Sequence, residues 1–398
     1  MRFERYSPRC ASFMAAYYIG QAVFQSFISL YYKAQGFTDG QIGYLSAALA
    51  LVSLLSMRLW GPLGDRVPVR NHLLLGLCLG ASASILLFFG AKTFAALLAF
   101  VCLYSVFYTS IQPLGDSIIL ETLEEERKPF GPIRMTGTLC FAFTSFFAGR
   151  LFGGAGQEDR IIYLTSVMML ATGATSFILP RVEGHQYAGG KNLPMRTLYR
   201  HKNLMKLFAM MLPLQIAMGY FYAFFSPFFA TSLPGGNTTL LGICYFMSAL
   251  SEVPFLSFGD RLFRRFGAGR LMCVSAAALA VRFTILGFTK SVPLAMASQL
   301  CHGGGFIVIT FVLSKYINRT CPDELKASGQ LLLSIFGFGL ARVVGYCAGG
   351  ILADRVGYAN VFKLTGALCA LTFIVFAPGF LRRPPLNGEG ERFTVKGE

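Results

Sequence analysis

Six ionisable side chains lie within long apolar stretches of this 398-residue sequence. An ionised group near the centre of a membrane helix costs about 2.5–3.5 kcal/mol on insertion scales, so it normally faces a partner or a water-filled cavity. Groups of this kind can bind a polar ligand or carry a proton, and they are therefore the first candidates for chemistry. The six are Asp116, Arg134, Glu252, Arg282, His302 and Arg342.

The elements that must position these groups have membrane-like composition. The chain is 54% hydrophobic and 14% charged, with a mean hydropathy of +0.56. A helix of roughly 20 apolar residues crosses the hydrocarbon core of a bilayer. We therefore predict an all-α membrane protein with twelve transmembrane helices. The predicted spans are about 11–32, 40–60, 72–90, 94–120, 133–153, 161–180, 204–230, 238–258, 270–289, 292–316, 328–352 and 358–380.

Positive charge alternates between the predicted loops. With the N-terminus inside, 26 of the 35 lysines and arginines fall in cytoplasmic segments and seven in outer loops. Because cytoplasmic loops carry an excess of Lys and Arg, both termini are predicted to be cytoplasmic, with the chain in the inner or plasma membrane. The net charge of +16 then reflects topology and contact with anionic lipid, so it requires no nucleic-acid partner.

Two further features are the length of the first apolar segment and the spacing of the cysteines. The first apolar segment has full spanning length and no small-residue cleavage pattern, so we expect no cleavable signal peptide. The ten cysteines are scattered and form no C-x-x-C pair, which predicts neither a disulfide framework nor a metal site.

A charged motif occurs twice. The stretch "GPLGDRVPVR", 61–70, has a partner in "SFGDRLFRRFGAGR", 257–270, and the two G-D-R triplets are 195 residues apart, close to half of the chain. We predict two pseudo-symmetric six-helix bundles, at 1–180 and 204–398, with a cavity between them and a polar cytoplasmic linker at 181–203. The second bundle would include a short cytoplasmic tail.

The first motif resembles the signature of the major facilitator superfamily. Gly61, Asp65, Arg66 and Arg70 match G-x-x-x-D-R-x-x-x-R, whereas Pro68 stands where the pattern usually has Gly. The resemblance implies a gate: Asp65 accepts hydrogen bonds from helix N-terminal amides or from an arginine, which locks the cytoplasmic helix ends in one state. The alternative is that the arginines serve only as topology anchors. The shorter twin contributes Asp260 and Arg261.

The stretch "PLGDSIILETLEEERKPFGPIRMTGT" resembles the branch that contains lactose permease and phenylpropionic acid permease. The resemblance implies that Asp116 and Arg134 bind the solute, while Arg282 and His302 take part in proton coupling. The proton-carrying glutamate of the lactose permease would fall on Gly305, which cannot titrate. Glu252, one span away, is the available replacement.

Helical spacing adds further candidates for the binding site. Gln112 and Asp116 share one helix face, as do Tyr17, Gln21 and Gln25 on the first span, and we expect these two faces to line one pocket. In the second half, Gln215 and Tyr222 share a face. Two alternatives remain open: His302 as a structural hydrogen-bonding group, and the aromatic run 219–229 as packing. The predicted solute-binding residues are Asp116, Arg134, Gln112, Tyr17, Gln21, Gln25, Gln215, Tyr222 and Arg342.

These features favour a secondary active transporter, not an enzyme, that moves a small organic solute by alternating access with proton symport. The solute would be a sugar, a nucleoside or an aromatic carboxylate. The sequence has no phosphate-binding loop, so we expect a monomer that uses an ion gradient, with no cofactor. An uncoupled facilitator or exchanger of the same fold is one alternative, and a polytopic membrane enzyme or lipid scramblase is another.

Overall fold

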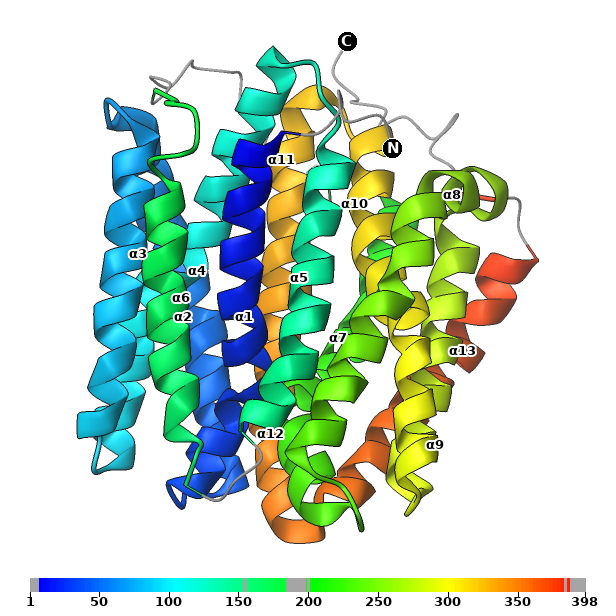
Figure 1. Cartoon of the computed structure of the whole chain (residues 1–398). Helices are drawn as coiled ribbons and strands as arrows, with labels where there is room; N and C mark the ends of the chain where they lie inside the picture. Colours follow the sequence, from blue (N-terminus) through cyan, green and yellow to red (C-terminus); the bar gives the residue numbers. More distant parts are fainter. Residues whose placement is uncertain (1–6, 153–155, 184–197, 199–200, 383–384, 387–398) are drawn as a thin grey trace. The chain divides into compact units, whose positions relative to one another are not determined.

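The computed structural model describes residues 7–152, 156–183, 198, 201–382 and 385–386, and the described elements are helices without strands (Figure 1). Most of the predicted linker, 181–203, and most of the C-terminal tail therefore lie outside the described residues. The longer helices are α1 (Pro8–Ala34), α2 (Asp39–Arg66), α3 (Arg70–Leu86), α4 (Phe94–Glu125), α5 (Phe130–Leu151), α6 (Asp159–Thr175), α7 (Lys202–Pro227), α8 (Thr238–Phe288), α10 (Val308–Thr320), α12 (Ala341–Val356) and α13 (Tyr358–Leu381). The shorter segments are η2 (Leu87–Gly90), η4 (Phe228–Ser232), α9 (Val292–Ala297), η5 (Ser298–Leu300), η6 (Gly303–Ile307), α11 (Asp323–Leu332) and η7 (Leu333–Leu340).

Eight helical segments in the described part of the chain are long and apolar enough to cross a membrane. Helices α1, α5 and α6 are not among them; α6 has only 17 residues, and α1 carries several tyrosines and glutamines. Helix α8 counts once, although it contains two predicted spans. The protein is therefore a multi-helical membrane protein, and the number of twelve spans stays a prediction. The eight segments are Asp39–Gly64, Arg70–Gly90, Phe94–Glu125, Lys202–Ser232, Thr238–Phe288, Val292–Thr320, Ser328–Val356 and Tyr358–Leu381.

The chain divides into two compact units. Unit 1 comprises Met1–Ala188, Phe229–Ser232 and Gly236–Phe246, and unit 2 comprises Gly189–Phe228, Leu233–Gly235 and Met247–Glu398. The structural candidates discussed below each lie within one unit.

In unit 1, α1 packs on α5 and α6, while α4 packs on α2 and α3 (Figure 1). Polar side chains join these helices inside the apolar interior. Ser82 on α3 hydrogen-bonds Ser166 on α6 at 2.8 Å, and the Trp60 indole on α2 donates to the carbonyl of Val106 on α4 at 2.7 Å. Hydrogen bonds between helices supplement van der Waals packing where the hydrophobic effect between helices is absent.

The end of α6 is held by a side chain that sequence reasoning did not single out. The amide of Asn71, in the first turn of α3, donates to the carbonyls of Ser176, Leu179 and Pro180, and its oxygen accepts from the backbone of Val182. Helix ends leave unsatisfied carbonyls, and Asn71 satisfies those that follow α6.

In unit 2, α7 packs on α12 and α13. The backbones of α7 and α12 approach closely because glycines face the contact. A Cβ atom at Gly219 would lie 2.7 Å from the carbonyl oxygen of Arg342, and one at Gly345 would collide with the carbonyl oxygen of Ile216. Small residues at helix contacts commonly permit such approach in membranes. The contact fixes the register of Arg342 against α7.

Most of the repeated motif lies on helices, and residues 67–69 form the short connection between α2 and α3. Helix α2 continues to Arg66, and α8 continues through Gly259–Asp260–Arg261 to a sharp change of direction at Gly267, where φ is 71°. Positive φ suits glycine, so one residue makes the turn. The helices therefore extend beyond the predicted spans 40–60 and 238–258, which were placed by apolar residues alone. Glu252 is well inside a helix as a result.

Two π-helical segments lie next to predicted site residues in unit 2, His302 and Arg342. Segment η6 follows His302 directly, and η7 precedes α12, on which Arg342 is the second residue. Such widened turns are frequent at functional sites. Gly303 in η6 packs so closely on α8 that a Cβ atom would collide with the carbonyl oxygen of Ser251.

Candidate functional site

In unit 1 the predicted acid and base lie on α4 and α5 and are linked through a tyrosine. Gln112 donates to the Tyr18 hydroxyl at 2.8 Å and also hydrogen-bonds Asp116. The Arg134 guanidinium lies over the Tyr18 ring at 4.6 Å and donates to Thr138 at 3.2 Å. Asp116 and Arg134 form no direct ion pair among the described contacts. One Asp116 oxygen is buried without a hydrogen-bond partner in the described structure.

Tyrosines are the main component of this site that the sequence reasoning missed. Tyr17, predicted to line the pocket, hydrogen-bonds and stacks on Tyr108, which stacks in turn on Tyr104 at 4.8 Å between ring centroids. The side chain of Gln112 hydrogen-bonds Tyr18, which is not on the predicted face formed by Tyr17, Gln21 and Gln25. Tyr104 and Tyr108 are four residues apart on α4, the spacing that could have revealed them.

Gln21 and Gln25 continue the Tyr17 face of α1 as predicted, and both are half-buried. Neither side chain has a hydrogen-bond partner among the described residues. Their amides therefore remain candidates to contact a solute, without a structural contact that assigns them this role.

In unit 2 the structure brings together the three predicted coupling residues from α8 and from the η5–η6 region. His302 Nε2 lies 3.2 Å from Glu252 Oε1, and Arg282 Nη1 lies 2.7 Å from His302 Nδ1. Arg282 is fully buried and lies over the Phe221 ring at 3.9 Å. The histidine therefore connects the carboxylate with the guanidinium.

The geometry assigns the histidine tautomer. A guanidinium nitrogen can only donate, so His302 Nδ1 must accept from Arg282. The ring proton is then on Nε2 and is donated to the Glu252 carboxylate. A second proton on the ring would face Arg282, so His302 in this arrangement is neutral and bridges its two partners.

Gln299 completes this network and was missed. Its side-chain oxygen accepts from Arg282 and, at 3.3 Å, from Ser248, while its amide nitrogen donates to the carbonyl of Ala295 at 3.0 Å. Gln299 precedes His302 by three residues, so the helical spacing from a candidate histidine was the signal available. A neutral partner lets Arg282 keep its charge without a second buried acid.

Arg342 on α12 contacts both predicted α7 residues. Its Nε donates to Gln215 Oε1 at 3.3 Å, and its guanidinium lies 4.9 Å from the centre of the Tyr222 ring. Phe338 and Phe306 also face the guanidinium, at 4.9 and 5.7 Å. The predicted common face of Gln215 and Tyr222 therefore meets an arginine.

Phe306 joins the two parts of unit 2. Its ring stacks on His302 with centroids 5.4 Å apart, and it contacts the Tyr222 ring at 5.9 Å. Together, Glu252, His302, Arg282, Gln299, Phe306, Arg342 and Gln215 form one continuous cluster, here called the unit 2 cluster. Charged groups inside membrane helices that pair in this way mark solute or proton pathways.

A protein-family model, described as the MFS_1 like family, matches residues 10–364. The chain belongs to this family. It is a multi-pass membrane transporter and not an enzyme, as the sequence predicted.

Relatives with named functions match nearly the full chain. Maltose permease of Geobacillus stearothermophilus is 25% identical over 376 residues, which cover 91% of each chain. The probable 3-phenylpropionic acid transporter of Escherichia coli K12 is 23% identical over 370 residues, covering 91% of this chain and 94% of the relative. The crystal structure of the nucleoside transporter NupG superposes with a TM-score of 0.79 at 16% identity, covering 96% of this chain and all of the other. The last likeness shows the fold.

The structure describes most of the superfamily motif at residues 61–70. Arg70 is buried; its Nη1 lies 3.3 Å from Glu121 on α4, and its Nε donates to the carbonyl of Gly64 at 3.4 Å. Arg66 is exposed. The side chain of Asp65 lies outside what the structure describes. The geometry thus adds Glu121, which sequence reasoning missed.

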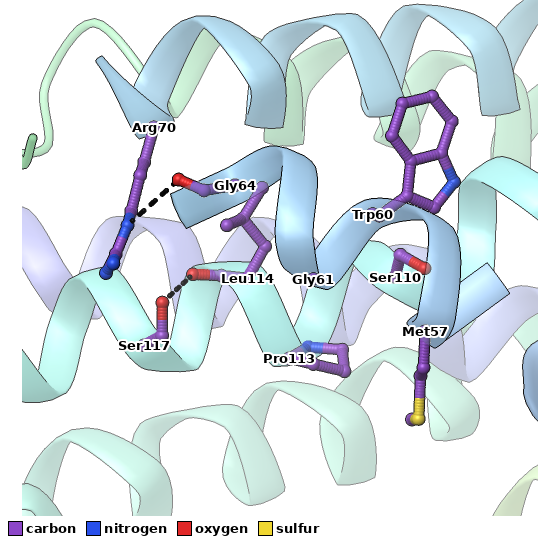
Figure 2. Close-up of a pocket in the computed structure, with 9 residues that line it drawn as sticks. All are labelled: Met57, Trp60, Gly61, Gly64, Arg70, Ser110, Pro113, Leu114 and Ser117. Carbon is purple, nitrogen blue, oxygen red and sulfur yellow. Dashed lines mark hydrogen bonds between the residues drawn. The ribbon is translucent and has the colours of Figure 1, made fainter. Parts of the chain in front are cut away.

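A cavity of about 420 Å³ lies beside this motif, between the C-terminal part of α2 and the middle of α4 (Figure 2). Of the residues predicted to act, it contains Gly61 and Arg70 and none of the solute-binding candidates. The cavity therefore lies beside the motif in unit 1, and Asp116 itself does not line it. Its lining residues are Met57, Trp60, Gly61, Gly64, Arg70, Ser110, Pro113, Leu114 and Ser117.

The twin motif makes a corresponding contact in unit 2. Asp260 forms an ion pair with Lys315 on α10, whereas Arg261 is exposed. In unit 1 the motif contributes an arginine, Arg70, that pairs with Glu121. In unit 2 the motif contributes an aspartate, Asp260, that pairs with Lys315.

Gly305, where the resemblance would place an acid, packs against a leucine side chain. A Cβ atom at Gly305 would lie 2.5 Å from a methyl carbon of Leu279 on α8. A larger residue there would require the Leu279 side chain to shift. In this chain the carboxylate beside His302 comes from Glu252 instead.

Proposed function

We propose that the protein is a twelve-span secondary transporter, built of six-helix bundles at 1–180 and 204–398 joined by the linker 181–203. It moves a small organic solute across the inner or plasma membrane by alternating access, in symport with protons, with both termini cytoplasmic. The named relatives support a solute in the range of sugars, nucleosides and aromatic acids.

The observation that carries proton coupling is the contact of Glu252 with His302 and of His302 with Arg282. A nearby guanidinium favours the charged form of a carboxyl group, and removal from water favours the neutral form. A motion that separates Arg282 from this network therefore changes the electrostatic surroundings of the Glu252 carboxyl group. Solute binding that favours one arrangement then changes proton binding by the same free energy.

In unit 1, Asp116 and Arg134 would orient the solute. The free Asp116 oxygen is a hydrogen-bond acceptor, and Arg134 supplies donors beside the tyrosines. These groups suit hydroxyl or amide groups on the solute. Arg70 with Glu121 and Asp260 with Lys315 would hold the cytoplasmic helix ends in one state.

The test of coupling is Glu252→Gln in the full chain reconstituted into liposomes. We expect this variant to lose accumulation of solute driven by an inside-alkaline pH gradient while it retains exchange of solute across the membrane. Exchange survives because it needs no release of the proton. Radiolabelled maltose, uridine and 3-phenylpropionate serve as the solutes.

Glu121→Gln is the matched control, because it removes a carboxylate of the same kind that pairs with Arg70 outside the unit 2 cluster. It should slow transport without abolishing accumulation. Accumulation by Glu252→Gln at the wild-type level contradicts proton coupling through this residue. Uptake by the wild type that is independent of the pH gradient favours the uncoupled facilitator, which the glycine at position 305 would suit.

A further inference from the structure

Two of the buried donors in unit 2 that have no acceptor among the described residues belong to side chains bonded to each other. They are Arg342 Nη2 and Gln215 Nε2, and their side chains are joined by the bond from Arg342 Nε to Gln215 Oε1. Buried donors are normally satisfied, and an unsatisfied one costs free energy. Because the two donors belong to bonded neighbours, one ligand group with two acceptor oxygens can satisfy both.

The charge around these donors favours an anion. Arg342 has two described hydrogen-bond partners, Gln215 and Tyr346, and both are uncharged. The unit 2 cluster contains two guanidiniums, Arg282 and Arg342, against the single carboxylate of Glu252, whose described partner is His302. A carboxylate matches the geometry of a guanidinium donor and supplies the missing negative charge.

The surroundings favour an aromatic body on the ligand. The rings of Tyr222, Phe306 and Phe338 all face the Arg342 guanidinium within 5.7 Å. Aromatic rings offer flat apolar surface for stacking and edge contacts. The hydroxyl groups of a sugar would lose hydrogen bonds to water against these rings.

The site is fixed before a ligand arrives. Gly219 packs on the backbone of Arg342, and Gly345 packs on the backbone of Ile216, so α7 and α12 hold Gln215 and Arg342 in one register. Preorganised donors lose little conformational freedom on binding.

We propose that Arg342 and Gln215 form the subsite that binds the carboxylate of an aromatic monocarboxylic acid, with Tyr222, Phe306 and Phe338 around its apolar part. This inference rests on the proposed transport function and assigns its solute class. It also assigns to Arg342 a role separate from the Glu252–His302–Arg282 contact.

The test compares two probes that differ in charge and little in shape: 3-phenylpropionate and its neutral amide, 3-phenylpropanamide. Binding to the purified full chain in detergent is measured by calorimetry. We expect the wild type to bind the acid about tenfold or more tightly than the amide, since a charge-assisted pair distinguishes them. Arg342→Gln should remove this preference.

Arg150→Gln is the matched control variant, because Arg150 also lies over a phenylalanine ring, at 5.0 Å from Phe146, but lies in unit 1. It should keep the preference. If Arg342→Gln fails to fold, Gln215→Leu provides the second variant. It retains the guanidinium and removes one donor, so it should weaken the acid several-fold more than the amide.

Equal binding of acid and amide by the wild type, an unchanged preference in Arg342→Gln or in Gln215→Leu, or no binding of the acid overturns the inference. The two proposals fail separately. Maltose or uridine uptake driven by a pH gradient, without binding of the acid, removes this inference and leaves proton symport. If the acid binds as expected but transport is independent of the pH gradient, proton symport is contradicted and this inference stands.

Discussion

Gln299 shows how one neutral residue permits a buried charge. The Arg282 guanidinium is fully buried, and its described partners include the Gln299 oxygen, the ring of His302 and the face of Phe221. A buried charge is costly unless hydrogen bonds and opposite or polarisable groups surround it. Gln299 supplies an acceptor without adding a second acid, so Glu252 is the one carboxyl group described beside the histidine.

We predict that Gln299→Leu destabilises the protein more than Gln299→Glu. Leucine leaves a guanidinium donor of Arg282 unpaired, which costs about 1–3 kcal/mol, whereas glutamate provides an acceptor with charge. The melting temperature of the purified protein in detergent measures the difference. Ser251→Ala, which removes a hydroxyl that accepts from Gly303, is the comparison for a neutral hydrogen bond. Equal melting temperatures for the Leu and Glu variants would contradict this role.

At the scale of elements, the π-helical segment η6 determines where His302 lies. Gly303 sits against the carbonyl of Ser251 on α8, and its backbone N–H donates to the Ser251 hydroxyl at 2.8 Å. The next residue along α8 is Glu252. The close backbone contact therefore brings the helix that carries the carboxylate to the segment that carries the histidine.

We predict that Gly303→Ala lowers stability and Gly304→Ala does not. A methyl group at position 303 collides with α8 backbone, while at position 304 its nearest contact is a ring carbon of Phe255 at 3.4 Å. Overpacking of this kind costs about 1–3 kcal/mol. Thermal unfolding of the two variants in the same detergent measures it. The close contact would be ruled out if both variants melted with the wild type.

The motif contacts also act at the scale of elements. Asp260 is largely exposed and Arg70 is buried, so the pair with Lys315 and the pair with Glu121 differ in their surroundings. Exposed ion pairs contribute little to stability, about 0–1 kcal/mol. In a transporter, the two motif pairs would hold the helix ends together in one arrangement and release them in the other.

At the scale of the whole molecule, the distribution of positive charge predicts topology. The 26 lysines and arginines assigned to cytoplasmic segments outnumber the seven assigned to outer loops. Short loops rich in Lys and Arg stay on the cytoplasmic side during insertion. An even number of spans then puts both ends of this sequence on the same side.

We predict that a reporter fused after Glu398 is cytoplasmic, and that one inserted after Lys92, in the predicted outer loop between α3 and α4, is external. Paired fusions to alkaline phosphatase and green fluorescent protein measure the two positions, because the first is active only outside and the second fluoresces only inside. An external C-terminal reporter would contradict the even number of spans.

The sequence by itself determined the class of protein and its all-helical, membrane-spanning character. Apolar segments of membrane length leave the backbone no choice but to form its hydrogen bonds within each helix, so span positions follow from hydropathy. The candidates Glu252, Arg282 and His302 followed as well, because charge in such segments is costly and therefore informative. Helix ends did not follow from hydropathy: Gly259–Asp260–Arg261 is helical, because charged residues can extend a helix beyond the hydrocarbon.

Only the tertiary structure decided which of these groups meet. Hydropathy does not show which helices face each other. It therefore could not predict the hydrogen bond between Arg342 and Gln215. Nor could it predict that Tyr18 contacts both Gln112 and Arg134. Neutral members such as Gln299 carry no insertion cost large enough to stand out in a sequence. Their role comes from glycine contacts, at Gly303 and Gly345, that let backbones approach and bring side chains from distant segments within hydrogen-bonding distance.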